Sequence, residues 1–411
     1  MTEHMNEQAI AHEHVSYPNK KHEEYKYCDI EKLFTNDFSL FHEKLTDLST
    51  IEHQLKNVLD AVQEDAIVLV HVDGMFYKSI SRIHPIDGLQ IQFCSPTSDH
   101  LLFQNYFDKC IDREESLIKN NATFLNEVLF INSAKGAEIS QPIICVYFST
   151  SQSKKHLCTR RLVVAEKRSK LHIVDVFVGE ENSTHFHNSV TEIAIEKNAK
   201  VNHVSIQNSS SSEVLLNTTH ALQHEYCKYK NFTLTLNGLL VRNNTNATLD
   251  GEFIEAFMYG LYLVGNRSVV DNHTLVDHQK PNCYSNELYK GVITDRGTGV
   301  FNGKIFVRQD AQKTNAYQSN KNILVSKDAT VNTKPQLEIF ADDVKCSHGT
   351  STGKIDEEAL FYLQSRGISR EAAKQMMLHA FIAEVSDALP SWSLNSYISA
   401  ILEQKLIGHE G

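Results

Sequence analysis

The spacing of apolar residues changes along the first part of the chain and predicts a mixed region. From Cys28 to Leu59 apolar residues recur every three or four positions, which is a helical spacing. From Ala66 to Ile80 they alternate around Asp73-Gly74, a pair typical of a hairpin turn. A second helical stretch is expected from Leu101 to Phe130. We therefore predict a helical and strand region over residues 28–130.

The middle of the chain, residues 131–350, has short alternating runs that predict strands. A five-residue unit recurs there at 195–199, 307–311 and 325–329: Ile or Val, any residue, Lys or Gln, Asn or Asp, then Ala. Its last two copies are 18 residues apart, which we interpret as one coil of a parallel β-helix. A two-sheet β-sandwich with similar turns is the alternative that periodicity alone leaves open.

Helical spacing returns after Gly353 and predicts a C-terminal helical domain over residues 351–411. A first helix begins at Asp356 and ends near Gly367, Ser369 is suited to cap a second, and a third is expected from 394 to 406. The predicted fold class is mainly β, with a parallel β-helix core between an N-terminal α/β region and a C-terminal helical domain.

Composition and charge narrow the function. The 411 residues are 41% hydrophobic, enough for a large core, and 40 basic against 51 acidic side chains leave a net charge of −11, so nucleic acid is not an expected partner. Residues 1–27 are polar, without the apolar segment of a signal peptide, and predict a disordered or peripheral arm. No stretch is apolar enough to predict a membrane span. The eight scattered cysteines lack a CxxC pair, which favours a reducing cytoplasm over a disulfide framework.

Several short motifs resemble functional sites, but most are better explained as parts of the fold. The segment 349–355 resembles a phosphate loop, but it has three residues between its glycines and Ile355 where Ser or Thr would bind magnesium. The pairs His220/His224 and His185/His187 are interpreted as structural histidines. No pattern of nucleophilic or acid/base catalysis is present in the sequence.

Cys346-Ser-His348 is a stronger candidate for a metal site. In an extended chain the thiol and the imidazole project to the same side, and both donors suit iron or zinc. A purely structural role for the two residues is the alternative.

Two longer segments resemble a known family. Residues 337–349 (LEIFADDVKCSHG) and 355–368 (IDEEALFYLQSRGI), with shorter matches from about residue 250, are similar to the SufB/SufD family of iron–sulfur cluster assembly proteins. The run TKPQLEI at 333–339 resembles the SufD branch more than the SufB branch.

The resemblance implies a non-catalytic scaffold subunit with a right-handed parallel β-helix, which pairs with SufB and is coupled to the ATPase SufC. It implies a transient iron or iron–sulfur cluster at the SufB interface, with His348 as a ligand and Cys346 as its neighbour, and no cofactor bound permanently by this chain alone. The residues then expected to contact SufC are Asp356, Glu357, Leu360, Phe361, Leu363, Met376, Met377 and Phe381.

Three other functions stay open beside this one. The chain could be a SufB-like paralogue, or a scaffold that associates with itself as a homodimer, because the end strands of a β-helix are free to pair. A more distant alternative is a β-helical enzyme acting on polysaccharides, for which an export signal would be expected.

Overall fold

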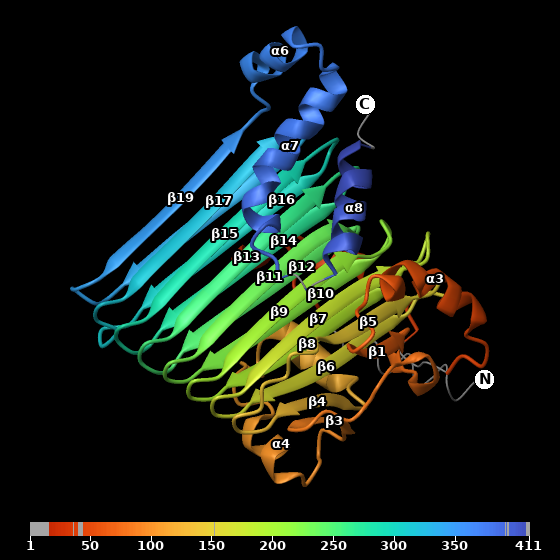
Figure 1. Cartoon of the computed structure of the whole chain (residues 1–411), viewed down its shortest axis with the longest axis vertical. Helices are drawn as coiled ribbons and strands as arrows, with labels where there is room; N and C mark the ends of the chain where they lie inside the picture. Colours follow the sequence, from red (N-terminus) through yellow and green to blue (C-terminus); the bar gives the residue numbers. More distant parts are fainter. Residues whose placement is uncertain are drawn as a thin grey trace.

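The computed structural model describes residues 16–35, 37–39, 44–151, 153–390, 392 and 394–407. Strands account for 44% and helices for 19% of the chain, so the predicted mainly β class is confirmed. The strands form a parallel β-solenoid of about eight turns, with helices associated with its N-terminal and C-terminal parts (Figure 1). No helix in these described ranges is both long and apolar enough to cross a membrane.

Two sheets form the solenoid, and the chain passes from one to the other after nearly every strand. Sheet 1 contains, in spatial order, β19 (Lys345–Gly353), β17 (Asn315–Leu324), β15 (Tyr284–Ile293), β13 (Glu255–Val264), β11 (Lys228–Asn237), β9 (Lys200–Asn208), β7 (Lys170–Gly179), β5 (Ile143–Ser149), β1 (Ile67–Val72) and β2 (Met75–Phe76). Sheet 2 contains β18 (Thr330–Ile339), β16 (Thr298–Val307), β14 (Val269–His278), β12 (Leu240–Leu249), β10 (Val214–Gln223), β8 (Phe186–Ile195), β6 (His156–Ala165), β4 (Val128–Ser133) and β3 (Leu89–Cys94). Strands of both sheets thus begin before residue 131.

One coil of the solenoid is longer than the sequence suggested. Consecutive strands of sheet 2 place Ile195, Gln223, Leu249, His278, Val307 and Ile339 side by side, so a coil takes 26 to 32 residues there. The 18-residue spacing is the step from the end of β16 to the end of β17 on the opposite sheet, which is about half a coil. The interpretation of this spacing as a full coil was wrong, because each coil contains two strands of about ten residues and the repeated unit follows either of them.

The repeated unit marks corners at which the chain leaves a sheet. Its alanines, Ala199, Ala311 and Ala329, are buried at these corners. In the first copy Asn198 has a φ of 63°, and its backbone N–H donates to the Glu225 carbonyl of the next coil at 2.9 Å. Every hydrogen-bonded pair between coils is parallel, which excludes the β-sandwich alternative.

The N-terminal region is less regular than predicted. The helix expected over 28–59 is two helices, α2 (Ile30–Leu33) and α3 (Ser49–Asp60), and residues 40–43 lie outside the described part. Phe34 and Phe38 do not continue one helical stripe; their rings pack around Phe186 of sheet 2. The helical stretch expected over 101–130 is α4 (Leu101–Tyr106), α5 (Ser116–Thr123) and then β4.

The predicted hairpin agrees with the structure, whereas the predicted arm is described only in part. The hairpin is present, since Asp73 and Gly74 both have positive φ between β1 and β2. Two single turns of 3₁₀ helix, Glu23–Tyr25 and Lys78–Ile80, complete the region. Residues 1–15 of the predicted arm lie outside the described residues, whereas Tyr17 is buried against sheet 2.

The three C-terminal helices follow the predicted order: α6 (Glu357–Ser365), α7 (Arg370–Ser386) and α8 (Asn395–Ile407). Asp356 and Ser369 cap the first two through their side-chain oxygens, and Gly367 has the positive φ of a helix end. Helices α7, α8 and α3 pack their apolar side chains on the outer face of sheet 1, while α6 projects beyond the end of the sheets (Figure 1).

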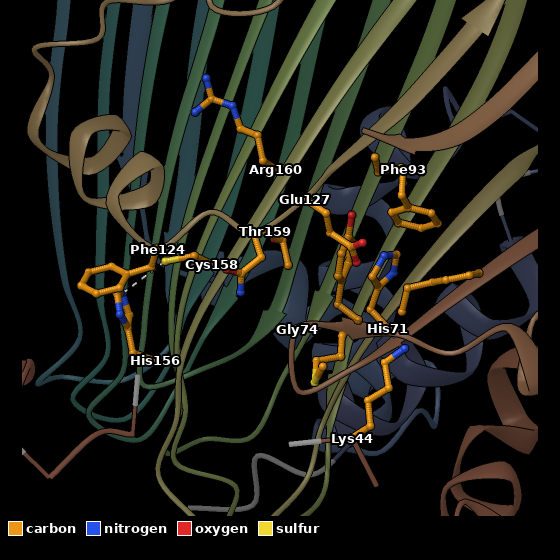
Figure 2. A pocket seen from close by; sticks show the side chains of 15 residues that line it. Lys44, His71, Gly74, Phe93, Phe124, Glu127, His156, Cys158, Thr159 and Arg160 are labelled. Carbon is orange, nitrogen blue, oxygen red and sulfur yellow. Dashed lines mark hydrogen bonds between the residues drawn. The ribbon is translucent and has the colours of Figure 1, made fainter. Parts of the chain in front are cut away.

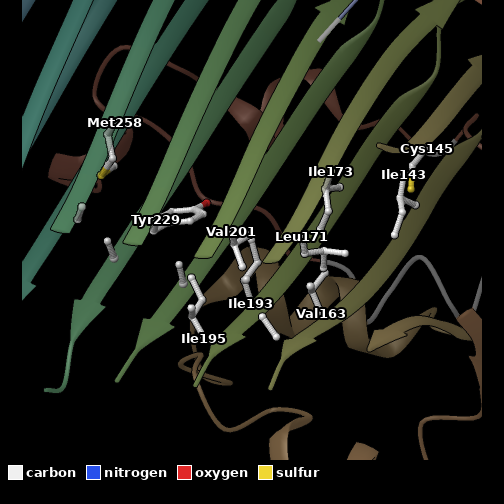
Figure 3. Packing of buried hydrophobic residues seen from close by; sticks show 14 of the residues in the cluster. Ile143, Cys145, Val163, Leu171, Ile173, Ile193, Ile195, Val201, Tyr229 and Met258 are labelled. Atoms are coloured by element: carbon white, nitrogen blue, oxygen red, sulfur yellow. The ribbon is translucent and has the colours of Figure 1, made fainter. Parts of the chain in front are cut away.

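The interior between the sheets is apolar at many positions and includes a buried ion pair. Ile143, Leu171, Ile193 and Val201 are among the buried residues that meet between the two sheets (Figure 3). Next to them Arg161 of β6 binds Asp175 of β7 in a buried, bidentate ion pair.

The carboxylate of Asp175 has further partners. It lies 2.7 Å from the Nε2 atom of His203 on β9. Burial alone would raise the pKa of Asp175, but Arg161 and His203 hold it well below its usual value. The ion pair therefore joins the two sheets inside the solenoid.

This interior pair gives a stability prediction. Asp175→Leu leaves the Arg161 guanidinium buried without its carboxylate, and we expect the free energy of unfolding to fall by about 3–5 kcal/mol. The double variant Arg161→Met/Asp175→Leu removes both charges and should regain most of that loss. Denaturant titration followed by circular dichroism measures both values.

A surface ion pair provides the control. Glu225→Gln breaks the exposed Lys197–Glu225 pair and should cost under about 1 kcal/mol. A double variant as unstable as Asp175→Leu alone would show that the buried charge is not what matters.

Candidate metal and partner site

The last coil of the solenoid has a free edge. Strand β18 pairs only with β16, and β19 only with β17, so neither has a second strand neighbour among the described residues. Most residues of these two strands are exposed or half-buried, unlike those of earlier coils. Two adjacent strands therefore present unpaired backbone donors and acceptors to a partner.

His348 lies on the inner side of β19 at this open end. The register places Cys346 beside Ala316 and His348 beside Gln318, and Ala316 and Gln318 are both buried inside the solenoid. Cys346 and His348 thus share one side of the strand, as the extended spacing predicted. Because no further coil covers β19, the His348 side chain is exposed.

Cys346 is less accessible than its neighbour. It is half-buried and packs against the small apolar cluster that includes Ile305, Val307 and Ala316. Burial raises the pKa of its thiol, which disfavours the thiolate that binds metal. Of the two candidates, His348 is therefore the better placed to bind a metal.

A buried carboxyl group lies two coils behind His348 in the same inward-facing column. Register relates Glu287 of β15 to Gln318 of β17, and Gln318 to His348. Glu287 is 1% exposed, and its Oε1 atom accepts a hydrogen bond from Gln318 Nε2 at 3.0 Å. Burial raises the pKa of Glu287 to about 7. This pair was not predicted from the sequence, although the alternation along 284–293 was a usable signal.

The residues expected to contact SufC are only partly on the surface. Phe361 is 72% and Met376 52% exposed, and Tyr362, which was not predicted from the sequence, is 57% exposed. Leu360 is buried. Phe381 is half-buried, with its ring under the Lys290 ammonium group of β15.

The remaining predicted contact residues are distributed over the same helices. Asp356 and Glu357 are exposed at the start of α6, and Leu363 and Met377 are half-buried. The exposed apolar surface of this region therefore comprises Phe361, Tyr362 and Met376, which we call the α6–α7 apolar patch.

The motifs interpreted as structural have ordinary protein partners. Residues 349–353 form part of strand β19 and not a loop. His185 bonds to Asp73, and the ring of His187 bonds to the Thr159 hydroxyl at 2.9 Å. His220 bonds to Thr248.

A pocket of about 350 Å³ lies among the first coils, far along the chain from the predicted site residues. Figure 2 shows the His71 ring and the Glu127 carboxyl group at one side of it, and Phe124 with His156 at the other. Burial lowers the pKa of His71 to about 4 and raises that of Glu127. None of the residues predicted from the sequence to bind metal or SufC lines this pocket.

Comparison with protein families covers nearly the whole chain. Residues 147–381 match the family described as "SUF system FeS cluster assembly, SufBD core domain". Residues 1–145 match the family described as "SufBD protein N-terminal region".

Similar curated proteins agree with these matches. The iron–sulfur cluster assembly protein SufD of Escherichia coli is 30% identical over 95% of this chain and 90% of its own length. The SufD protein of Bacillus subtilis is 26% identical over 91% of this chain and 87% of its own length. Protein ABCI7, chloroplastic, of Arabidopsis thaliana is 28% identical over 91% of this chain and 80% of its own length.

The shifted pKa of Glu287 predicts a pH dependence of stability. Its protonated form is favoured in the folded state, so this group's contribution is lost as pH rises from about 4.5 through 7. The loss should amount to about 3 kcal/mol. Glu287→Gln stays neutral and keeps an acceptor, so its unfolding free energy should fall less than the wild type's between pH 5 and 8.

Denaturant titrations of both proteins across this pH range measure the difference. Glu225→Gln is the control, since Lys197 lowers the pKa of Glu225, and it should not reproduce the effect. Parallel pH profiles for wild type and Glu287→Gln would contradict a neutral Glu287 in the folded protein.

Proposed function

Since the chain belongs to the SufBD family of iron–sulfur cluster assembly proteins, we propose that it is a scaffold subunit that pairs with SufB and is driven by SufC. The observation that carries this proposal is His348 on the inner side of an unpaired terminal strand. The cluster is the cargo of such a scaffold and not its resident cofactor.

The free edge of the solenoid supports pairing with another solenoid. A second parallel β-solenoid can add its own terminal strands to β18 and β19 by backbone hydrogen bonds. Phe340, which follows β18 and is 59% exposed, supplies an apolar contact beside that edge. The interface would therefore extend both sheets into the partner.

Cluster binding at this interface would use donors from both subunits. His348 supplies an imidazole, which is a reasonable iron ligand beside thiolates. The half-buried Cys346 is a secondary candidate. Tetrahedral coordination needs more donors than these two, so SufB would supply the others.

The C-terminal helices support coupling to an ATPase. The α6–α7 apolar patch offers SufC exposed apolar side chains on the helices that follow the open edge. Lys290 of β15 donates to the Phe381 carbonyl of α7 at 2.6 Å and lies 2.8 Å from Glu384. A displacement of α7 would reach the strand that carries Glu287, so ATP-driven movement of SufC could open the ligand site.

In this proposal the chain is non-catalytic and ATP hydrolysis belongs to SufC. A cytoplasmic location also stays a proposal, since the plant relative named above is chloroplastic.

Replacing the proposed ligand tests its role. We expect His348→Ala, co-expressed with SufB and SufC under anaerobic conditions, to form the complex but to lose most of the iron–sulfur absorbance. The imidazole is removed without a change in the backbone edge. His53→Ala, an exposed histidine on α3, is the matched control and should keep the cluster. Unchanged absorbance in His348→Ala would reject the ligand assignment.

The same free edge also fits a second copy of this chain, which is the second candidate. Size measurement of the chain purified alone and with SufB separates the two cases. A homodimer that persists when SufB is present in excess would favour self-association over pairing with SufB.

The α6–α7 apolar patch gives a separate prediction. Phe361→Ser should weaken SufC binding at least about tenfold, because a truncated aromatic anchor commonly costs about 2 kcal/mol or more, while SufB binding stays unchanged. Leu101→Ser is the control, since Leu101 is 73% exposed on α4. Affinity measurement with purified SufC checks both variants, and equal binding by Phe361→Ser and wild type would place the SufC contact elsewhere.

A further inference from the structure

Gln318 occupies the position between Glu287 and His348 in the inward-facing column. Its side chain is buried, and only its amide nitrogen has a partner: Nε2 donates to Glu287 Oε1 at 3.0 Å. The amide oxygen Oε1 has no hydrogen-bond partner within the described part of the chain. A buried carbonyl oxygen without a donor lowers the stability of the folded protein, so we expect this oxygen to accept a hydrogen bond in the working state of the protein.

The observed hydrogen bond shows which end of the amide faces β15. Glu287 Oε1 accepts from the NH₂ group of Gln318, so that group lies on the side toward β15. Gly303 leaves room for this arrangement, since a Cβ atom there would stand 2.4 Å from Gln318 Nε2. The amide oxygen is thus left for the coil that follows, where the residue in the column is His348.

We propose that Gln318 is a positioning residue for His348. Its amide oxygen accepts the N–H of one imidazole nitrogen when His348 binds its metal cargo, and the other nitrogen then faces the open edge as the ligand atom. This inference rests on the proposed function, because it assumes that His348 binds iron.

The chemistry of imidazole explains the advantage. A neutral histidine has one N–H donor and one lone pair, and either nitrogen can carry the hydrogen. Metal-binding histidines commonly donate their second ring N–H to a carbonyl or carboxylate, which fixes the tautomer and the ring orientation. His348 is exposed, so its ring needs such a partner to be held in one orientation. Gln318 is the buried acceptor beside it, and Glu287 holds that acceptor in place.

The test uses the complex of the full chain with SufB and SufC, with its cluster reduced. Pulsed electron paramagnetic resonance detects the remote nitrogen of a ligating imidazole, and its quadrupole coupling changes when its N–H loses a hydrogen bond. We expect the signal in the wild type, its loss in His348→Ala, and a changed coupling in Gln318→Leu. The iron dissociation constant by chelator competition should rise about tenfold or more in Gln318→Leu.

A reversed pair provides the control. In the double variant Glu287→Gln/Gln318→Glu, the amide introduced at position 287 donates to the carboxylate introduced at position 318, and the second oxygen of that carboxylate still faces His348. This variant should keep the nitrogen coupling of the wild type and bind iron about as tightly, since a carboxyl oxygen still accepts the N–H of His348. Failure of Gln318→Leu to fold would leave the double variant as the deciding measurement.

The outcomes separate the two proposals. If His348→Ala leaves the imidazole signal unchanged, His348 is not a ligand and the proposed function fails at this residue. If His348→Ala abolishes the signal but Gln318→Leu matches the wild type in coupling and in iron affinity, the ligand assignment stands and the role of Gln318 is rejected. The role of Gln318 is also rejected if the double variant shows the same changed nitrogen coupling as Gln318→Leu and binds iron as weakly.

Discussion

The structure depends on backbone hydrogen bonds between coils. Each internal strand bonds to the strand one coil before it and to the strand one coil after it, so every strand is covered by the next. This arrangement cannot end without leaving an edge. At the beginning of the solenoid the outermost strands run antiparallel to their neighbours, β2 on one sheet and β3 on the other. At the end the outermost strands β18 and β19 continue the parallel order, so their free edges could extend the same pattern into another chain.

The same stacking explains how the interior tolerates polar groups. Side chains at matching positions of successive coils form a column, in which neighbouring members are about 4.8 Å apart. A buried polar group can therefore find a partner one coil away on the same sheet, or on the opposite sheet. Arg161 and Asp175 join opposite sheets, whereas Glu287 and Gln318 lie in one column. Some buried polar atoms stay unpaired even so. The amide oxygen of Gln318, next to the last coil, has no partner among the described residues, and the same is true of the Gln223 amide in an internal coil.

The fold class could be predicted from the sequence, but the number of residues in one coil could not. Alternating runs and the repeated unit indicated coils, but the unit follows strands of either sheet, so its spacing corresponds to about half a coil. The single helix expected from Cys28 was wrong because Phe34 and Phe38 pack separately on a sheet that the local sequence does not reveal. Capping residues such as Asp356 and Ser369 act locally, and they placed the C-terminal helices well.

The residues of the candidate site likewise differ in whether local sequence could predict them. Cys346 and His348 could be found because their pairing is local: two residues apart on an extended strand. Glu287 and Gln318 lie 61 and 30 positions before His348, and only the coil length brings the three into one column. A coil length misjudged by half would place Glu287 and Gln318 on the wrong sheet. The surroundings of His348 at the last coil are therefore set by the whole solenoid. A change that alters coil length near β15 or β17 would disturb His348 without touching it.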